Sequence, residues 1–104
     1  MREYTVILEK QAASDLDGIF RYITDELIEP NIAARIILSI EEKIMSLGTM
    51  PHRHAVVRHE PHKSRAIRWM PVENYVAFYI IDENNYSVKV LTILHQRRNW
   101  QELL

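Results

Sequence analysis

The stretch YVAFYIIDENNYSVKVLTIL, residues 75–94, decides the fold of this 104-residue chain. Two runs rich in β-branched and aromatic residues, 75–82 and 86–94, flank the polar tetrapeptide DENN, residues 82–85. Such runs are typical of β-strands, and an Asp/Asn-rich segment between them is typical of a turn. We therefore predict an antiparallel β-hairpin over residues 75–94.

Further strand-like segments lie on both sides of this hairpin. RAIRWM, residues 65–70, is predicted to be a strand that PVEN, residues 71–74, links to the hairpin. YTVILE, residues 4–9, is short and β-branched, which predicts another strand. The intervening residues 48–64 contain two prolines and four histidines, and we expect mostly loop there, with a short strand at residues 55–57.

Two helices are predicted between the first strand and that loop, because apolar residues recur there at helical spacing. The apolar stripes are Ala12, Leu16, Ile19, Phe20, Ile23 and Leu27 in residues 11–28, and Ile32, Ile36, Ile37, Ile40, Ile44 and Leu47 in residues 32–47. Pro30 separates the two segments, and Asn31 is expected to cap the second. Gly48 is a typical residue just beyond a helix C-terminus. The pair forms an αα-hairpin.

The predicted order is therefore β-α-α-β-β-β, in which helices and strands are segregated along the chain. This pattern indicates the α+β class, with an antiparallel sheet packed on the N-terminal helical hairpin and its other face partly open. The length predicts a single domain over residues 1–104.

Composition narrows the class of protein. The chain has no cysteine and no apolar run long enough to span a membrane, so we expect a cytoplasmic protein without disulfides and without contact with a membrane. The net charge is −1, but residues 1–47 carry five basic against nine acidic side chains, and residues 48–104 carry eight basic against five acidic ones. This asymmetry favours one surface for an anionic or acidic partner.

Some site classes are disfavoured by the motifs. His52, His54, His59 and His62 have spacings that could seat zinc, but a loop fixes no ligand geometry, and solvated histidines are the favoured interpretation. Only two glycines are present, so the chain has no Gly-rich phosphate loop, and no serine has a nucleophile signature. We predict neither a metal site nor a cofactor.

The candidate functional residues are cationic and aromatic. Arg65 and Arg68 interrupt the predicted strand at opposite parities, where a guanidinium could bind phosphate or carboxylate, or could pair within the chain. In the last strand, strict alternation puts Lys89, Leu91, Ile93 and His95 on one face and Val88, Val90, Thr92 and Leu94 on the other.

The chain after the last strand, HQRRNW (residues 95–100), adds four more candidates. His95 beside cations could act as a general base, and Arg97 or Arg98 could neutralise a phosphate. Trp100 could stack on a base, or it could simply cover the core. The residues alone leave both interpretations open.

Together these motifs carry a resemblance. The order of elements, AASDLDGIFRYI (12–23), SLGTMP (46–51), YVAFYII (75–81) and VLTILHQRRNW (90–100) resemble the RelE/ParE superfamily of bacterial toxins from type II toxin–antitoxin systems. The resemblance spans nearly the whole chain. It implies a cytoplasmic toxin that a cognate antitoxin wraps and neutralises, often by pairing with the sheet edge, and that reaches operator DNA only through the antitoxin. Whether the protein forms a homodimer is left undecided by the resemblance.

The superfamily divides by target. RelE-like members cut mRNA on the ribosome, and the resemblance would make His95 and Arg97 catalytic. ParE-like members poison DNA gyrase, and the resemblance would then assign target binding to Arg65, Arg68, Arg98 and Trp100 and place the helical hairpin against gyrase.

This chain departs from the RelE-like pattern at two positions. The pattern Tyr-Arg-x-x-Tyr has a catalytic arginine where this chain has Val76, and the expected terminal tyrosine is Leu103. A ribosome-binding nuclease is also usually strongly basic, whereas the pI here is about 6.5. We therefore favour the gyrase-directed function, with the endoribonuclease as the alternative and an antitoxin-binding co-repressor without toxicity as the third.

Overall fold

The predicted hairpin forms the centre of the sheet. The computed structural model describes residues 3–104, in which β3 (Tyr75–Asp82) and β4 (Ser87–His95) are paired antiparallel. Asp82 makes the turn, because its carboxylate accepts hydrogen bonds from the backbone N–H groups of Asn84 and Asn85 at 3.1 and 3.2 Å. The Asp/Asn-rich tetrapeptide thus turns the chain as the sequence predicts.

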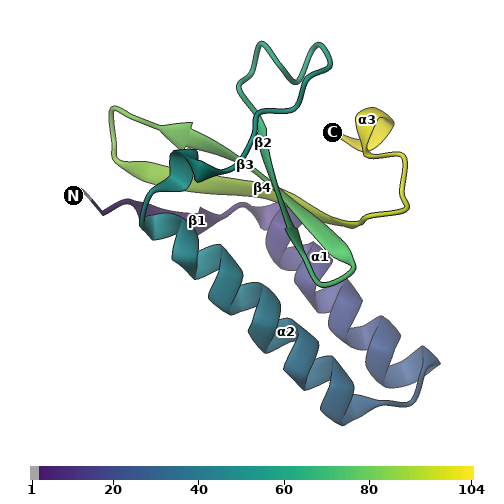
Figure 1. Ribbon diagram of the computed structural model, residues 1–104. Helices are drawn as coiled ribbons and strands as arrows, with labels where there is room; N and C mark the ends of the chain where they lie inside the picture. The colour runs from purple at the N-terminus through teal and green to yellow at the C-terminus, as the bar shows by residue number, and fades with distance from the viewer. Residues whose placement is uncertain (1–2) are drawn as a thin grey trace.

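The other two strands lie at the edges, in the order β1-β4-β3-β2 (Figure 1). β2 (Arg68–Val72) pairs antiparallel with β3, but β1 (Thr5–Leu8) pairs parallel with β4. The α+β class and the element order are confirmed, whereas the expectation of a purely antiparallel sheet is wrong, and the sheet is mixed. The reason is that the second helix ends beside the start of β1, so β2 enters the sheet from the same end as β1 and runs in the same direction. β3 then runs back, and β4 again runs in the direction of β1.

Both predicted helices are present and form the expected hairpin on one face of the sheet (Figure 1). α1 (Lys10–Arg21) continues into a π-helical turn at Tyr22–Glu26, and α2 (Pro30–Met45) continues into a 3-10 turn at Ser46–Gly48. Asn31 does not cap α2, because Pro30 occupies the first helical position, where its missing N–H costs no hydrogen bond. No helix in residues 3–104 is long and apolar enough to cross a membrane.

Two hydrophobic clusters hold the layers together. The larger lies between the helices and the sheet, and its buried members are Ala12, Leu16, Ile19, Ile23, Ala33, Ile40, Ile44, Leu47, Met70, Val72, Ala77, Tyr79, Val88, Val90 and Ile93. The smaller lies on the opposite face of the sheet, where Val57, Ile67, Val76 and Phe78 are buried. The short helix α3 (Trp100–Leu103) contributes to this second cluster, so the face opposite the hairpin is only partly open.

The two edge strands differ in how they are closed. The first half of β2 is covered by residues 55–57, through hydrogen bonds from the Trp69 N–H to the Ala55 carbonyl and from the Val57 N–H to the Ile67 carbonyl. The short strand expected at 55–57 is thus reduced to one bridge, between Val56 and Arg68. Farther along β2, Pro71 has no N–H to donate. At the other edge, Ile7 and Leu8 of β1 are exposed.

Gly48 is required for a different reason from the one that its position predicts. It does not adopt a positive φ, so it is not a left-handed cap. Instead its carbonyl accepts the Tyr4 N–H at 2.8 Å, and a Cβ at this position would lie 3.0 Å from the Tyr4 carbonyl oxygen. The glycine therefore lets the end of α2 approach β1 closely.

Alanine substitution of the two glycines should have opposite effects. Gly48→Ala should lower the free energy of unfolding by about 1–2 kcal/mol, because the added methyl group pushes against backbone. Gly18→Ala should raise it by up to about 1 kcal/mol, because a Cβ at this helical position meets nothing within 4 Å. Urea denaturation of both variants checks this, and equal effects would contradict the close-approach account.

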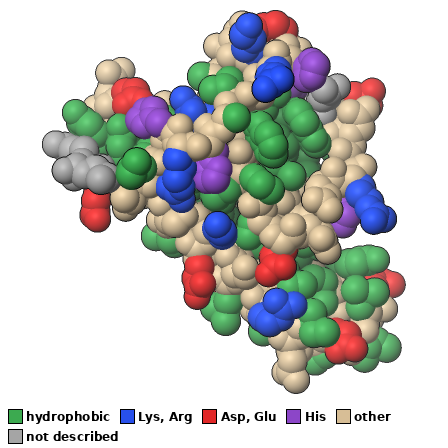
Figure 2. Space-filling model, viewed as in Figure 1, with side chains coloured by type: hydrophobic (Ala, Val, Ile, Leu, Met, Phe, Trp, Pro, Cys, Tyr) green, Lys and Arg blue, Asp and Glu red, His purple; other side chains and the backbone are tan. Residues whose placement is uncertain are grey.

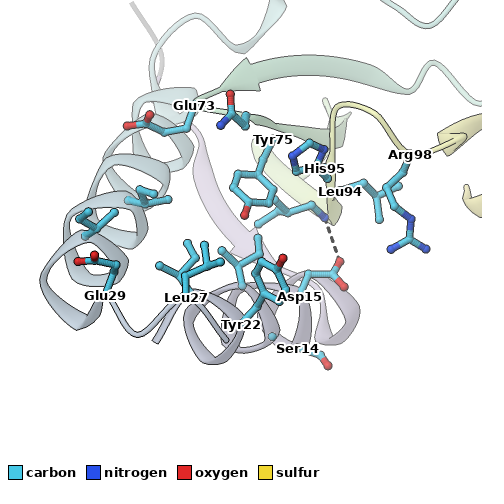
Figure 3. A pocket seen from close by; sticks show the side chains of 17 residues that line it. Ser14, Asp15, Tyr22, Leu27, Glu29, Glu73, Tyr75, Leu94, His95 and Arg98 are labelled. Carbon is cyan, nitrogen blue, oxygen red and sulfur yellow. Dashed lines mark hydrogen bonds between the residues drawn. The ribbon is translucent and has the colours of Figure 1, made fainter. Parts of the chain in front are cut away.

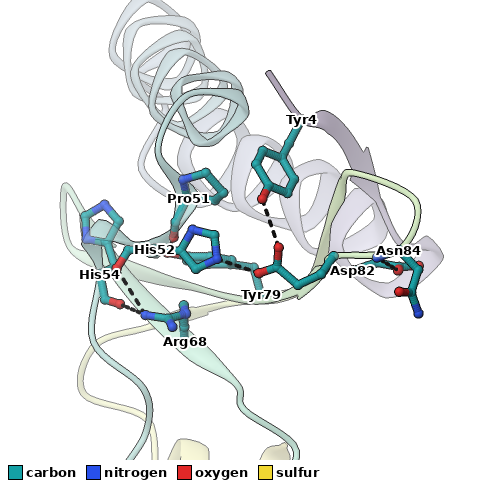
Figure 4. A network of polar contacts seen from close by, with 9 residues as sticks. Tyr4, Pro51, His52, His54, Arg68, Tyr79, Asp82 and Asn84 are labelled. Carbon is teal, nitrogen blue, oxygen red and sulfur yellow. Dashed lines mark hydrogen bonds and ion pairs between the residues drawn. The ribbon is translucent and has the colours of Figure 1, made fainter. Parts of the chain in front are cut away.

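Tyr79 ties the sheet to the segment after α2 (Figure 4). Its ring is fully buried in the larger cluster, and its hydroxyl donates to the Pro51 carbonyl at 2.6 Å. Burial raises the pKa of Tyr79 to about 12, partly offset by the nearby Arg68 and Arg53. The unfolded chain loses this proton near its ordinary pKa of about 10, so stability is fully present below pH 10 and falls as the pH rises towards 12.

Tyr79→Phe should therefore cost about 1–2 kcal/mol at pH 7, because the Pro51 carbonyl loses its donor. The same variant should lose less stability than the wild type between pH 10 and 12, by about 2 kcal/mol. Denaturant titrations of the variant and the wild type at pH 10 and at pH 12 measure this difference. If both proteins lose the same free energy of unfolding between these pH values, Tyr79 does not control the loss.

Candidate functional site

A groove of about 730 Å³ opens between the helical hairpin and the end of the sheet. Figure 3 shows Tyr22 and Asp15 of α1 and the following turn facing Tyr75 and His95, which stand side by side on β3 and β4. Arg98 lies on the rim beyond Leu94. The groove thus combines apolar walls with a few polar groups, which is typical of binding sites.

His95 reaches this groove because β4 is irregular. Tyr79 pairs with Val90 but Phe78 pairs with Thr92, so one extra residue, Leu91, is inserted and forms a β-bulge. The expected alternation is therefore wrong beyond Leu91: Ile93 joins the core under the helices, together with Val88 and Val90. His95 lies opposite Tyr75, on the helix-covered side of the sheet.

The His95 ring is oriented by two neighbours. It meets the Tyr75 ring edge-on at a centroid distance of 5.4 Å, and its Nδ1 accepts the Arg97 backbone N–H at 3.2 Å. Burial, with a smaller contribution from Tyr22, raises the pKa of the Tyr75 hydroxyl, so Tyr75 is a neutral hydrogen-bonding group in the groove. The remaining ring nitrogen of His95, Nε2, is the one available for a ligand.

Arg98 and Arg65 are brought together although they are far apart in sequence. Both line a second cavity of about 440 Å³ next to the groove, together with Leu91, Thr92 and Leu94. In residues 3–104 no carboxylate lies within ion-pairing distance of Arg65, Arg97 or Arg98. These guanidinium groups therefore remain available to an anionic or acidic partner.

Arg65 is not on a strand, contrary to the prediction. β2 begins only at Arg68, and Arg65 lies in the preceding turn, where its N–H bonds to the Pro61 carbonyl at 3.3 Å. Ala66 has a positive φ of 56°, a conformation that no regular strand contains. The parity argument for Arg65 and Arg68 consequently does not hold.

Arg68 does not join the other arginines. It is half-buried at the start of β2, and its Nη1 donates to the carbonyls of His52 and His54 at 3.1 and 2.6 Å (Figure 4). These bonds hold the segment after α2 against the sheet. The guanidinium therefore bonds backbone carbonyls within the chain, which is neither a phosphate or carboxylate contact nor an internal ion pair.

The histidines of the loop differ in their contacts and burial. His52 pairs with Glu83, which also accepts the Tyr4 hydroxyl, and these contacts lower the pKa of the Glu83 carboxyl. Burial, followed by the charges of Arg53, Lys43 and Arg68, lowers the pKa of His54. His62 is buried, against the expectation of solvated histidines. The part of the chain that the structure describes contains no cluster of three or more potential metal ligands.

Trp100 covers the smaller cluster. Its ring lies against Phe78 at a centroid distance of 5.2 Å, and Leu104 packs beside it. Arg97 is exposed in the turn before it. On the face in Figure 2, the basic side chains accordingly lie in separate places rather than in one patch.

Sequence reasoning missed Asp15 and the groove tyrosines. Asp15 lies three residues after buried Ala12 and four before buried Ile19, so it faces the sheet. An acidic residue on the apolar stripe of a helix is the signal that could have identified it, because a buried carboxylate needs partners.

Comparison with models of known protein families shows to which family the chain belongs. The family model described as ParE toxin of type II toxin–antitoxin system, parDE, matches residues 6–100. The chain belongs to the ParE toxin family. It is therefore the toxin component of a type II toxin–antitoxin system.

Solved structures share the fold of this ParE-family toxin. The chromosomal ParDE system from P. aeruginosa gives a TM-score of 0.73 at 22% identity, covering 89% of this chain and 96% of that one. The RelBE2 toxin–antitoxin complex from Mycobacterium tuberculosis gives 0.64 at 24% identity, covering 91% and 93%. The archaeal RelE–RelB complex from Pyrococcus horikoshii OT3 gives 0.52 at 17% identity, covering 92% and 98%. A search of curated sequences finds no significant match.

Substitution of Arg68 and of Arg65 should have different effects on the free energy of unfolding. Arg68→Ala should lower the free energy of unfolding by about 1.5–3 kcal/mol, because the carbonyls of His52 and His54, of which the His54 bond is partly buried, lose a charged donor. Arg65→Ala should change it by less than about 0.5 kcal/mol, because the side chain is exposed. Thermal and urea unfolding measure both, and equal losses would contradict this division.

Proposed function

We propose that this ParE-family toxin inhibits growth by binding DNA gyrase in the cytoplasm, and that a cognate antitoxin neutralises it. The observation that carries the proposal is the sheet face opposite the helices. RNA-cutting members of the superfamily use an arginine at the position of Val76, but Val76 is 7% exposed and buried in the smaller cluster. Trp100 and Leu104 pack against that cluster, so apolar packing occupies a surface that a nuclease would need to be cationic.

The remaining features suit a protein target. The end of the helical hairpin exposes Tyr22, Leu27 and Ile28, of which Ile28 is 78% exposed. Exposed apolar side chains of this kind mark protein-binding surfaces. Arg65 and Arg98 add two unpaired cations beside the groove, which suits the acidic or DNA-bound surface of gyrase.

The antitoxin has two matching places on the toxin. In residues 3–104, β1 is an edge strand whose Ile7 and Leu8 side chains are exposed, and an extended segment could pair with it. The groove beside α1 could take an apolar helical segment. The solved complexes of similar fold are also toxin–antitoxin pairs. Operator DNA would then be bound through the antitoxin.

The direct test is the purified toxin with gyrase and supercoiled plasmid. Wild-type toxin should trap gyrase on cleaved DNA, and induction in cells without antitoxin should trigger a DNA-damage response. The double variant Arg65→Ala/Arg98→Ala should need at least about tenfold more protein for half-maximal trapping, which corresponds to about 1.4 kcal/mol. Lys43→Ala, which removes one positive charge at the far end of α2, is the control for a cation remote from these arginines and should retain wild-type potency.

The competing functions give different results in the same strains. An endoribonuclease would stop translation at once, leave codon-phased mRNA cuts and lose activity on His95→Ala or Arg97→Ala. A co-repressor without toxicity would neither slow growth nor trap gyrase, while still binding the antitoxin. Either result would overturn the gyrase proposal.

A further inference from the structure

Asp15 of α1 is bound to the irregular part of β4 across a separation of 77 residues. Its Oδ2 accepts the Thr92 hydroxyl at 2.5 Å and the Ile93 backbone N–H at 3.0 Å. Its Oδ1 accepts the Gln11 side-chain amide at 2.8 Å. No lysine, arginine or histidine in residues 3–104 forms an ion pair with it. Oδ2 thus holds the helix to the strand, while Oδ1 is used for a hydrogen bond within α1.

These bonds lie where the sheet ladder is interrupted. Leu91 is the extra residue between the Tyr79–Val90 and Phe78–Thr92 pairs. A bulge leaves polar groups without their usual partners in the ladder, and a buried N–H needs an acceptor. Asp15 supplies that acceptor to Ile93, which is itself buried in the main core. Figure 3 shows this bond as a dashed line that ends on the Asp15 carboxylate.

The bulge decides which side of the sheet His95 occupies. A regular β4 would place His95 on the same face as Lys89 and Leu91, away from the helices, because side chains alternate strictly along a strand. With one residue inserted, His95 pairs with Tyr75 and lines the groove. The insertion also sets where the chain leaves the sheet, and with it the position of Arg98 between the groove and the second cavity.

We propose that Asp15 is a positioning residue for target binding: by holding the β4 bulge, it directs His95 into the groove and places Arg98 on its rim. Asp15 acts through Thr92 and Ile93 rather than by touching the target. The inference rests on the proposed function for its activity readout. Its structural content, the side of the sheet on which His95 stands, is independent of which target the toxin acts on.

The test compares four variants of the full chain. Asp15→Ala removes both bonds to β4, and Thr92→Val removes only the hydroxyl while keeping the side-chain shape. Thr92→Ser keeps the hydroxyl and serves as the conservative rescue. Asp17→Ala, an exposed acidic residue on the same helix that pairs only with Arg21, is the matched control for charge. Folding is verified by circular dichroism before any comparison.

The first readout is the contact between the His95 and Tyr75 rings, followed by nuclear Overhauser effects. The second is the toxin concentration that gives half-maximal trapping of gyrase. Asp15→Ala and Thr92→Val should lose at least half of the ring-contact intensity and at least tenfold in potency. Thr92→Ser and Asp17→Ala should stay within twofold of the wild type in both readouts.

Each other outcome has a defined meaning. If Asp15→Ala and Thr92→Val fold and keep the Tyr75–His95 contact, the inference is wrong. It is also wrong if the contact is lost while potency is unchanged. If Asp15→Ala fails to fold, the Thr92→Val and Thr92→Ser pair alone decides. If the wild type does not trap gyrase, the proposed function fails, while the ring contact still tests the role of Asp15.

Discussion

Strand β4 must satisfy three neighbours at once, and the rest of the molecule depends on how it does so. It pairs with β1 on one side and β3 on the other, and α1 packs across its helix-facing surface. A strand in this central position cannot slide without exposing one set of apolar side chains and burying another. Its register is therefore fixed by the core, and the segment that follows it, from His95 to Trp100, is placed by that register.

The predictable part of the fold is the part encoded by local periodicity. Alternating apolar residues and the Asp82 turn specify the β3–β4 hairpin, and the apolar stripes specify the two helices. The parallel pairing of β1 with β4 is not encoded by local periodicity. It follows from the path of the chain, because α2 ends beside the start of β1, where Gly48 allows a close approach, and not from any pattern in the strand itself.

The site was less predictable, because its geometry depends on contacts between distant residues. The sequence of β4 does not predict the extra residue at Leu91. The carboxylate that bonds the next two residues, Thr92 and Ile93, belongs to Asp15 in the first helix. The composition of RAIRWM favours a strand at Arg65, but the positive φ of Ala66 breaks the strand there, and composition does not encode that conformation. The sequence also does not distinguish Arg68 from a ligand-binding arginine, because its two carbonyl partners lie 14 and 16 residues away.

The unequal closure of the sheet edges has a consequence for the behaviour of the free toxin. Growth of a sheet from one molecule to the next requires two open edges per molecule, as chain growth in a polymer requires two reactive ends. In residues 3–104, Pro71 and residues 55–57 block the edge at β2. The edge at the four-residue strand β1 is the one that stays open. A monomer with one reactive end can form a pair but cannot propagate. The free toxin would thus not assemble into fibres through its sheet.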